Sequence, residues 1–261
     1  MSRPLIIVAV VGLALSAVSL TLAGALSSRL WDDAGEILNN LPGGSRLTLH
    51  FNEGRRRDDC SVGSGRADST LSRRDLTWPD GETSLALDIP ARLHYRPGAP
   101  RQMVIEGRGD VLNHLKIEEG HVFFDCPWAK DIEARDLISD ITLGGVSIES
   151  FEIHGIGQLD LEGVSQPSLA IDVTGAGTVA GGGVTDQLDL AISGTGRVDL
   201  GKLVAKSADV TLSGASEARL AVRNEADVTI SGTGLLLWTL LPAKLESHVS
   251  GRGRIGKAEE R

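Results

Sequence analysis

Apolar and polar residues alternate along the C-terminal half of the chain, and a short glycine motif interrupts the alternation at nearly regular intervals. The clearest copy is LDLAISGTGRVDL at 188–200, and related copies begin at 151, 169, 208, 226 and 245. The first glycine of successive copies lies at 155, 175, 194, 214, 232 and 251, so the steps are 20, 19, 20, 18 and 19 residues. A period of this length is typical of solenoids.

The copies form columns when they are aligned on the first glycine. The columns six, four and two residues before it are mostly aliphatic, as in Leu188, Leu190 and Ile192. Because side chains alternate across a strand, we expect these columns to face inward and the polar columns between them to face water. One outward column is mostly acidic, and we call its members the acidic ladder: Asp189, Asp209, Asp227 and Glu246.

The alternation resumes after each glycine motif, so each repeat reads as strand, tight turn, strand. Paired glycines suit a sharp corner that needs a positive φ or a close backbone approach, and only Ser216 replaces one of them. The predicted turn glycines are Gly155, Gly157, Gly175, Gly177, Gly194, Gly196, Gly214, Gly232, Gly234, Gly251 and Gly253. The pattern predicts an all-β parallel β-solenoid of about six coils. An antiparallel meander of hairpins is the alternative.

The N-terminal half also shows strand patterns. Strands are expected at 84–89, 91–95, 102–107, 115–120 and 121–125, separated by turn residues such as Pro97-Gly98. The polar segment 55–74 is predicted to be a loop or hairpin tip, and no amphipathic helix is expected beyond residue 45. The predicted organisation is a linker at 26–45, a β-rich N-terminal section at 46–143 packed on a solenoid at 144–256, and a charged tail at 257–261.

The first residues predict export. The segment Leu5–Leu26 carries no charge and follows Arg3. It fits a signal peptide that is removed with residues 1–25, and it is also long enough to stay as an inner-membrane anchor. Both readings place the rest of the chain in the periplasm or cell envelope, with membrane contact only through this segment if it is uncleaved.

The composition indicates which classes of partner are disfavoured and whether a disulfide is expected. A net charge of −9 disfavours nucleic acid and anionic lipid surfaces as partners, and 3% aromatic residues imply an aliphatic core. Cys60 and Cys126 predict a disulfide in an oxidising compartment, with two unpaired buried thiols as the alternative. Their separation does not fit a zinc site.

No motif indicates catalysis, a metal or a cofactor. The glycine motif differs from a calcium-binding β-roll because its acid lies one position late, as at Asp199, and other copies have Ala180 or Arg219 there. The six histidines show no metal-ligand spacing, and nucleotide-loop, G-x-S-x-G and H-E-x-x-H patterns are absent. The acidic ladder is the one candidate ligand surface: it could bind a cation or a basic partner, or it could simply be solvated.

The V/I-S-G-T-G-x-V/L motifs at this spacing, preceded by DIPARLHYRPG and VIEGRGDVLNHLKIEEGHVFFD, resemble the head GIN domain of putative auto-transporter adhesins over roughly 46–256. The resemblance implies an exported bacterial envelope protein with a β-helical fold and no established catalytic residues. We therefore expect a non-catalytic, adhesin-like binding or structural module whose partner is an envelope protein or a glycan. A second copy of this chain, bound through the solenoid ends, is a further candidate partner. The alternative is a polysaccharide-acting β-helix lyase or hydrolase, which would need paired carboxylates and exposed aromatic side chains in a cleft.

Overall fold

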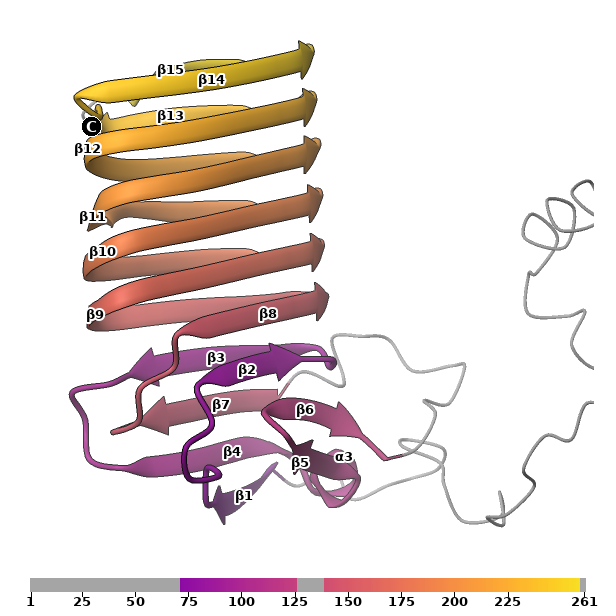
Figure 1. The fold of residues 1–261 in the computed structure, drawn as a ribbon. Coiled ribbons are helices and arrows are strands. Elements are labelled where there is room, and N and C mark those ends of the chain that lie inside the picture. The colour runs from indigo at the N-terminus through magenta and orange to yellow at the C-terminus, as the bar shows by residue number, and fades with distance from the viewer. Residues whose placement is uncertain (1–70, 126–138, 259–261) are drawn as a thin grey trace, which may run out of the picture. The chain divides into compact units, whose positions relative to one another are not determined.

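The computed structural model describes residues 71–125 and 139–258, and almost all of these residues that form regular structure are in β-strands (Figure 1). The one short helix in this part of the chain is α3 (Gly109–Asn113). The strands are β1 (Leu71–Leu76), β2 (Ser84–Leu87), β3 (Ala91–Arg96), β4 (Gln102–Arg108), β5 (Leu115–Glu118), β6 (His121–Phe124), β7 (Ser139–Gly144), β8 (Ser150–Gly155), β9 (Gly157–Gly175), β10 (Thr178–Gly194), β11 (Arg197–Gly214), β12 (Glu217–Gly232), β13 (Leu235–Leu240), β14 (Lys244–Gly251) and β15 (Arg254–Lys257).

The repeat region is a parallel β-solenoid, as predicted. Each of the long strands β9 to β12 makes most of one coil, and it pairs in parallel with the coils before and after it. The register places Gly175 beside Gly155, Gly194 beside Gly175 and so on to Gly251, so six corner glycines stack in five steps. This parallel pairing excludes the antiparallel meander for these coils.

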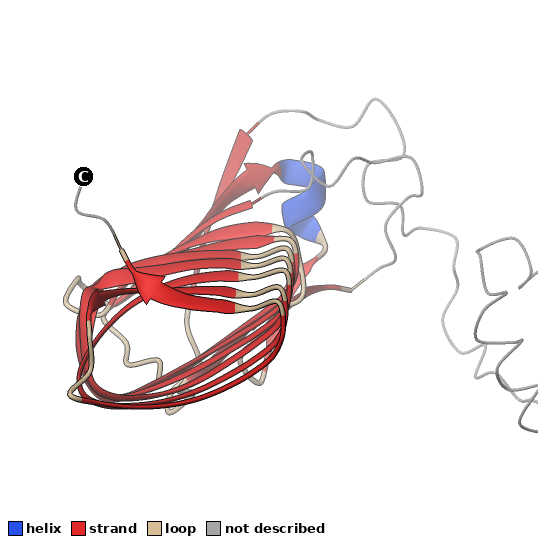
Figure 2. Cartoon of the chain, turned by 90° about the horizontal axis from the view of Figure 1, so that it is seen from above, coloured by secondary structure: helices blue, strands red, loops and turns tan. Residues whose placement is uncertain are grey.

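Each coil is flattened into two strand layers, which meet at the glycine corner on one side and at a smoother bend on the other (Figure 2). We call the layer before each corner the ladder face; its segments are 150–154, 168–174, 187–193, 207–213, 225–231 and 244–250. We call the layer after each corner the trough face; its segments are 157–162, 178–182, 197–202, 217–221, 235–239 and 254–257. The N-terminal strands continue both layers: β2, β6 and β5 extend the ladder face, and β3, β7, β4 and β1 extend the trough face.

The aliphatic columns form one continuous core between the two layers. Leu188, Leu190 and Ile192 are at most 2% exposed, and Trp238 is buried in the same core. The last coil departs from this pattern, because Leu245 and Val249 are 38% and 43% exposed although they occupy the inward columns.

In the corners from Gly175 to Gly251, the first glycine has both a positive φ and a close backbone neighbour, the two features that the sequence pattern predicted. Gly194 has a φ of +120°, and a Cβ added there would lie 2.5 Å from the carbonyl oxygen of Gly175 in the coil below. The second glycine has a different constraint, since a Cβ on Gly196 would lie 2.9 Å from Cγ2 of Ile192. Where both glycines are present, close stacking of the coils depends on the absence of a side chain at both positions.

Two expectations for the N-terminal half were wrong. Part of the segment 55–74 is strand, since β1 pairs with β4 in antiparallel register. β1 lacks a clear alternation of apolar and polar residues, because it is an edge strand whose residues are only half-buried or exposed. A helix also occurs beyond residue 45, but α3 has only five residues, too few for a helical period to show.

Tyr95 on β3 ties the N-terminal strands to the first coil. Its hydroxyl donates to the carbonyl oxygen of Val146 at 3.0 Å and accepts a hydrogen bond from the Ile148 amide at 2.9 Å. Its ring meets Phe151 of β8 edge-on, with 5.0 Å between the ring centroids. Burial raises the pKa of Tyr95, and the hydrogen bond from the Ile148 amide only partly opposes that shift, so the buried phenol stays protonated.

Five expectations lie wholly or mostly outside the described ranges. These are the export segment Leu5–Leu26, the linker at 26–45, the part of the predicted loop at 55–70, the pairing of Cys60 with Cys126, and most of the charged tail at 257–261. They stay predictions. Within 71–125 and 139–258, no helix is long and apolar enough to cross a membrane.

Candidate functional site

The acidic ladder lies on the outside of the ladder face. Asp189 is the register neighbour of Asp209, Asp209 of Asp227, and Asp227 of Glu246, and all four are exposed. Adjacent strands lie about 4.8 Å apart, so the carboxylates of successive coils are close neighbours. Like charges directly opposite each other across strands are destabilising, which makes a cation favourable beside them.

A neutral side chain holds the middle of the ladder in place. The amide nitrogen of Gln187 donates to Asp189 at 3.1 Å and to Asp209 at 2.8 Å. The hydroxyl of Ser207 donates in turn to the amide oxygen of Gln187 at 2.5 Å. These bonds orient two carboxylates without neutralising them.

The ladder is neutralised at its C-terminal end. Lys244 forms ion pairs with Glu225 and, at 2.9 Å, with Glu246. The hydrogen bond and positive charge of Lys244 lower the pKa of Glu246, and the two carboxylates raise the pKa of Lys244. The uncompensated part of the ladder is therefore the aspartate part.

A hollow of about 370 Å³ lies beside this uncompensated part. Ala170 occupies the ladder column in the coil before Asp189, and Ala191 lies one column nearer the corner. The side chains of these two alanines are short, so the surface is recessed there. Four carboxylates line the same hollow: Glu152, Asp172, Asp189 and Asp209. The ladder thus borders a concave acidic surface rather than a flat row of charges.

Two histidines meet an aspartate where the ladder face begins. Nδ1 of His154 lies 2.5 Å from Asp88, Nδ1 of His121 lies 3.1 Å from it, and Nε2 of His154 lies 3.6 Å from Glu152. Partial burial raises the pKa of Asp88, but the contacts with both imidazoles outweigh that effect and bring it below its ordinary value. Sequence spacing could not reveal this cluster, because β2, β6 and β8 are brought together only by the sheet. Within the described ranges, no group of three or more His, Cys, Asp or Glu side chains is arranged to hold a metal ion.

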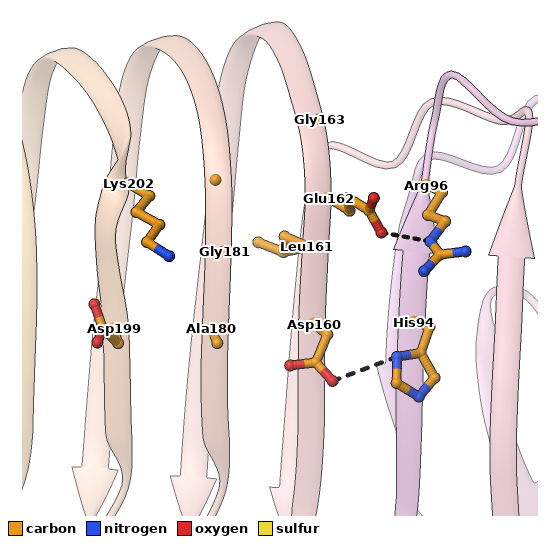
Figure 3. Close-up of a pocket in the computed structure, with 11 residues that line it drawn as sticks. His94, Arg96, Asp160, Leu161, Glu162, Gly163, Ala180, Gly181, Asp199 and Lys202 are labelled. Atoms are coloured by element: carbon orange, nitrogen blue, oxygen red, sulfur yellow. Dashed lines mark ion pairs between the residues drawn. The ribbon is translucent and has the colours of Figure 1, made fainter.

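A second hollow, of about 400 Å³, lies on the trough face (Figure 3). Its floor is Ala180, Gly181 and Gly182 of β10, which have almost no side chains. Asp160 and Glu162 of β9, with His94 and Arg96 of β3, line one side, and Asp199 and Lys202 of β11 line the other. We call this hollow the trough.

The trough has mixed charge, and two of its acids are paired. His94 lies 3.4 Å from Asp160, and Arg96 lies 2.6 Å from Glu162. A Cβ on Gly181 would lie 2.9 Å from Cβ of Leu161, so the inward column has no space for a side chain here. The trough was not predicted from the sequence, although two adjacent glycines, Gly181 and Gly182, form part of its floor. The contribution of β3 depends on a pairing between distant segments.

The model of the family described as putative auto-transporter adhesin, head GIN domain, matches residues 131–239. The resemblance to the head GIN domain family is confirmed. The matched segment is narrower than the 46–256 expected, and it contains the trough floor, the hollow on the ladder face and three of the four ladder residues. No curated protein matches the sequence.

Several solved structures are similar to this chain. A putative adhesin from Bacteroides fragilis is 14% identical, with 76% of this chain and 100% of that chain covered and a TM-score of 0.56. A putative adhesin from Parabacteroides merdae is 13% identical, with coverage of 74% and 98% and a TM-score of 0.46. A putative lipid binding protein from Parabacteroides distasonis is 12% identical, with coverage of 77% and 99% and a TM-score of 0.41. At these identities the first structure supports the fold alone.

Proposed function

We propose that the protein is exported and acts in the bacterial cell envelope as a non-catalytic, adhesin-like binding module. The hollow bordered by the acidic ladder binds a basic group of a partner. Three features support this proposal: the uncharged segment Leu5–Leu26, the adhesin description of the matching family, and a stiff core that displays side chains in fixed rows.

One observation carries the choice of ligand. Gln187 donates to both Asp189 and Asp209 beside the hollow, so two negative charges are oriented before a partner arrives. A lysine or arginine side chain entering there would replace like-charge repulsion with charge-assisted hydrogen bonds. The trough is less suited to a basic ligand because His94 and Arg96 already pair with Asp160 and Glu162.

The polysaccharide-acting enzyme is the weaker alternative. Such a site would place exposed aromatic side chains beside paired carboxylates. Among the described aromatic residues, Trp78, Tyr95, Phe151 and Trp238 are buried. Phe123 and Phe124 are half-buried on β6, and neither hollow includes them. The geometry therefore favours a binding surface.

The test is binding of an eight-residue lysine peptide to the full chain, measured by fluorescence anisotropy at low and physiological salt. Asp189→Asn with Asp209→Asn keeps acceptors for Gln187 but removes two charges, and we expect binding to weaken about tenfold. Asp80→Asn with Asp199→Asn removes two charges elsewhere and serves as the matched control. Equal affinity of both double variants would refute the ladder as the binding surface. A glycan array run in parallel tests the other partner class, and glycan binding lost only in the control variant would move the site to the trough.

A further inference from the structure

The two ends of the strand stack differ in how far other residues cover them. At the N-terminal end, Val111 and Leu112 of α3 are buried, and Leu112 joins the core cluster. The edge strands at this end carry exposed charges, including Arg73 and Asp75 on β1, which discourage pairing with another strand. Among the described residues, α3 and these charges therefore protect much of this end, although Leu71 of β1 is 85% exposed.

The C-terminal end is open in the described part of the chain. β14 pairs only with β12, β15 pairs only with β13, and no element lies beyond them (Figure 1). Every residue of β14 is exposed. Leu245 and Val249 occupy columns that are fully buried one coil earlier, at Ala226 and Ile230. Leu241, in the bend before β14, is 61% exposed. A repeat protein normally covers such a terminal coil.

The order of residues in β14 is complementary to itself. If two copies of β14 pair in antiparallel fashion about Ser247, Leu245 lies opposite Val249 of the other copy, and Glu246 lies opposite His248. The Leu–Val pairs point inward and extend the core, because opposed residues share a face. The Glu–His pairs point outward and bring opposite charges together when the histidine is protonated. Shifting this register by one residue would bring Leu245 opposite His248 and lose both matches.

We propose that the C-terminal end of the solenoid binds the same end of a second copy of this chain, through antiparallel pairing of β14 centred on Ser247. The contact is two-fold symmetric and uses the same surface on both copies. It closes at two copies, since the two-fold contact uses the C-terminal end of each copy once, and the charges on β1 discourage a further contact at the N-terminal end. It leaves the acidic ladder free up to Asp227, so a dimer would present two such surfaces, one on each side of the contact.

A cysteine at the symmetry position gives a direct test. Opposed residues of an antiparallel pair have Cα atoms about 4.5 to 5.5 Å apart, within disulfide range, so Ser247→Cys in the full chain should form a covalent dimer on oxidation. Ser250→Cys is the control, because the register places it opposite Lys244 and far from its own counterpart. We expect dimer only from Ser247→Cys, with mass spectrometry showing a 247–247 linkage. Equal dimer from both variants, or no dimer from either, would overturn the proposal. Linkage of 247 to Cys60 or Cys126 of the same chain would also overturn it, because the chain itself would then cover the edge.

A charge exchange tests the register without relying on a new bond. Glu246→His alone opposes two histidines, and His248→Glu alone opposes two glutamates, so each should shift sedimentation of the full chain toward monomer. The double variant restores an opposite pair and should return to dimer. These exposed positions lie outside the core, and unchanged thermal unfolding would confirm that each variant is folded. Failure of the double variant to recover would reject the proposed register.

Discussion

The repeat region and the N-terminal section share the same two strand layers but are held together in different ways. In the repeat, every coil makes the same parallel contacts, and stacked columns and corners define the register many times over. In the N-terminal section, antiparallel pairs of β1 with β4, β4 with β7 and β5 with β6 occur once each. Their placement depends on individual contacts such as those of Tyr95. We therefore expect the stability of the repeat region to depend most on its inward columns and glycine corners. The stability of the N-terminal section should depend on single polar contacts.

The largest expected effect comes from breaking an inward column. Ile192 is 1% exposed, so Ile192→Asp would bury an unpaired carboxylate and should cost about 5 kcal/mol of unfolding free energy. Asp189→Ser, three residues away on the outward side, should change it by less than about 0.5 kcal/mol. Urea unfolding of the full chain, followed by circular dichroism, measures both. Similar losses in the two variants would contradict the assignment of the columns.

The corner should be the next most sensitive feature. Gly194→Ala must adopt a φ of +120° and move a carbonyl oxygen that lies 2.5 Å from the new Cβ, so we expect a loss of about 3 kcal/mol. Gly163→Ala is the matched control, because Gly163 has a φ of +70° but nothing within 4 Å of its Cβ position. It should lose only about 1 kcal/mol. Denaturant midpoints compare the two, and equal losses would mean that close stacking of the corners adds nothing to backbone strain.

The sequence was sufficient to predict the solenoid because each column is repeated in several coils. It even contains the explanation of its one irregular corner. Ser216 replaces the second glycine where Leu212 replaces a β-branched residue. Leucine has a single Cγ atom, so it lacks the Cγ2 methyl group with which Ile192 approaches Gly196. The acidic ladder followed from the same alignment.

The features that were missed depend on contacts that occur only once. β1 escaped notice because its edge position leaves its residues exposed or half-buried. The trough needs β3 beside β9, and the Asp88 cluster needs β2, β6 and β8 together, and no local pattern encodes these pairings. The open last coil was hidden for the opposite reason: Leu245 and Val249 match the inward pattern, but no further coil in the described residues covers them.

The smallest of the three effects should come from the N-terminal section. Tyr95→Phe keeps the edge-on ring contact with Phe151 but removes the acceptor of the Ile148 amide and the donor to the Val146 carbonyl. Ile148 is fully buried, so its amide would lack a partner, and a loss of about 2 kcal/mol is expected. Amide hydrogen exchange shows which region of the chain loses stability. Faster exchange at Ile148 with unchanged protection around Ile192 would show that the N-terminal section loosens while the coils hold. Uniformly faster exchange would mean instead that the two regions unfold as one unit, because parallel pairing of β3 and β8 with β9 couples them.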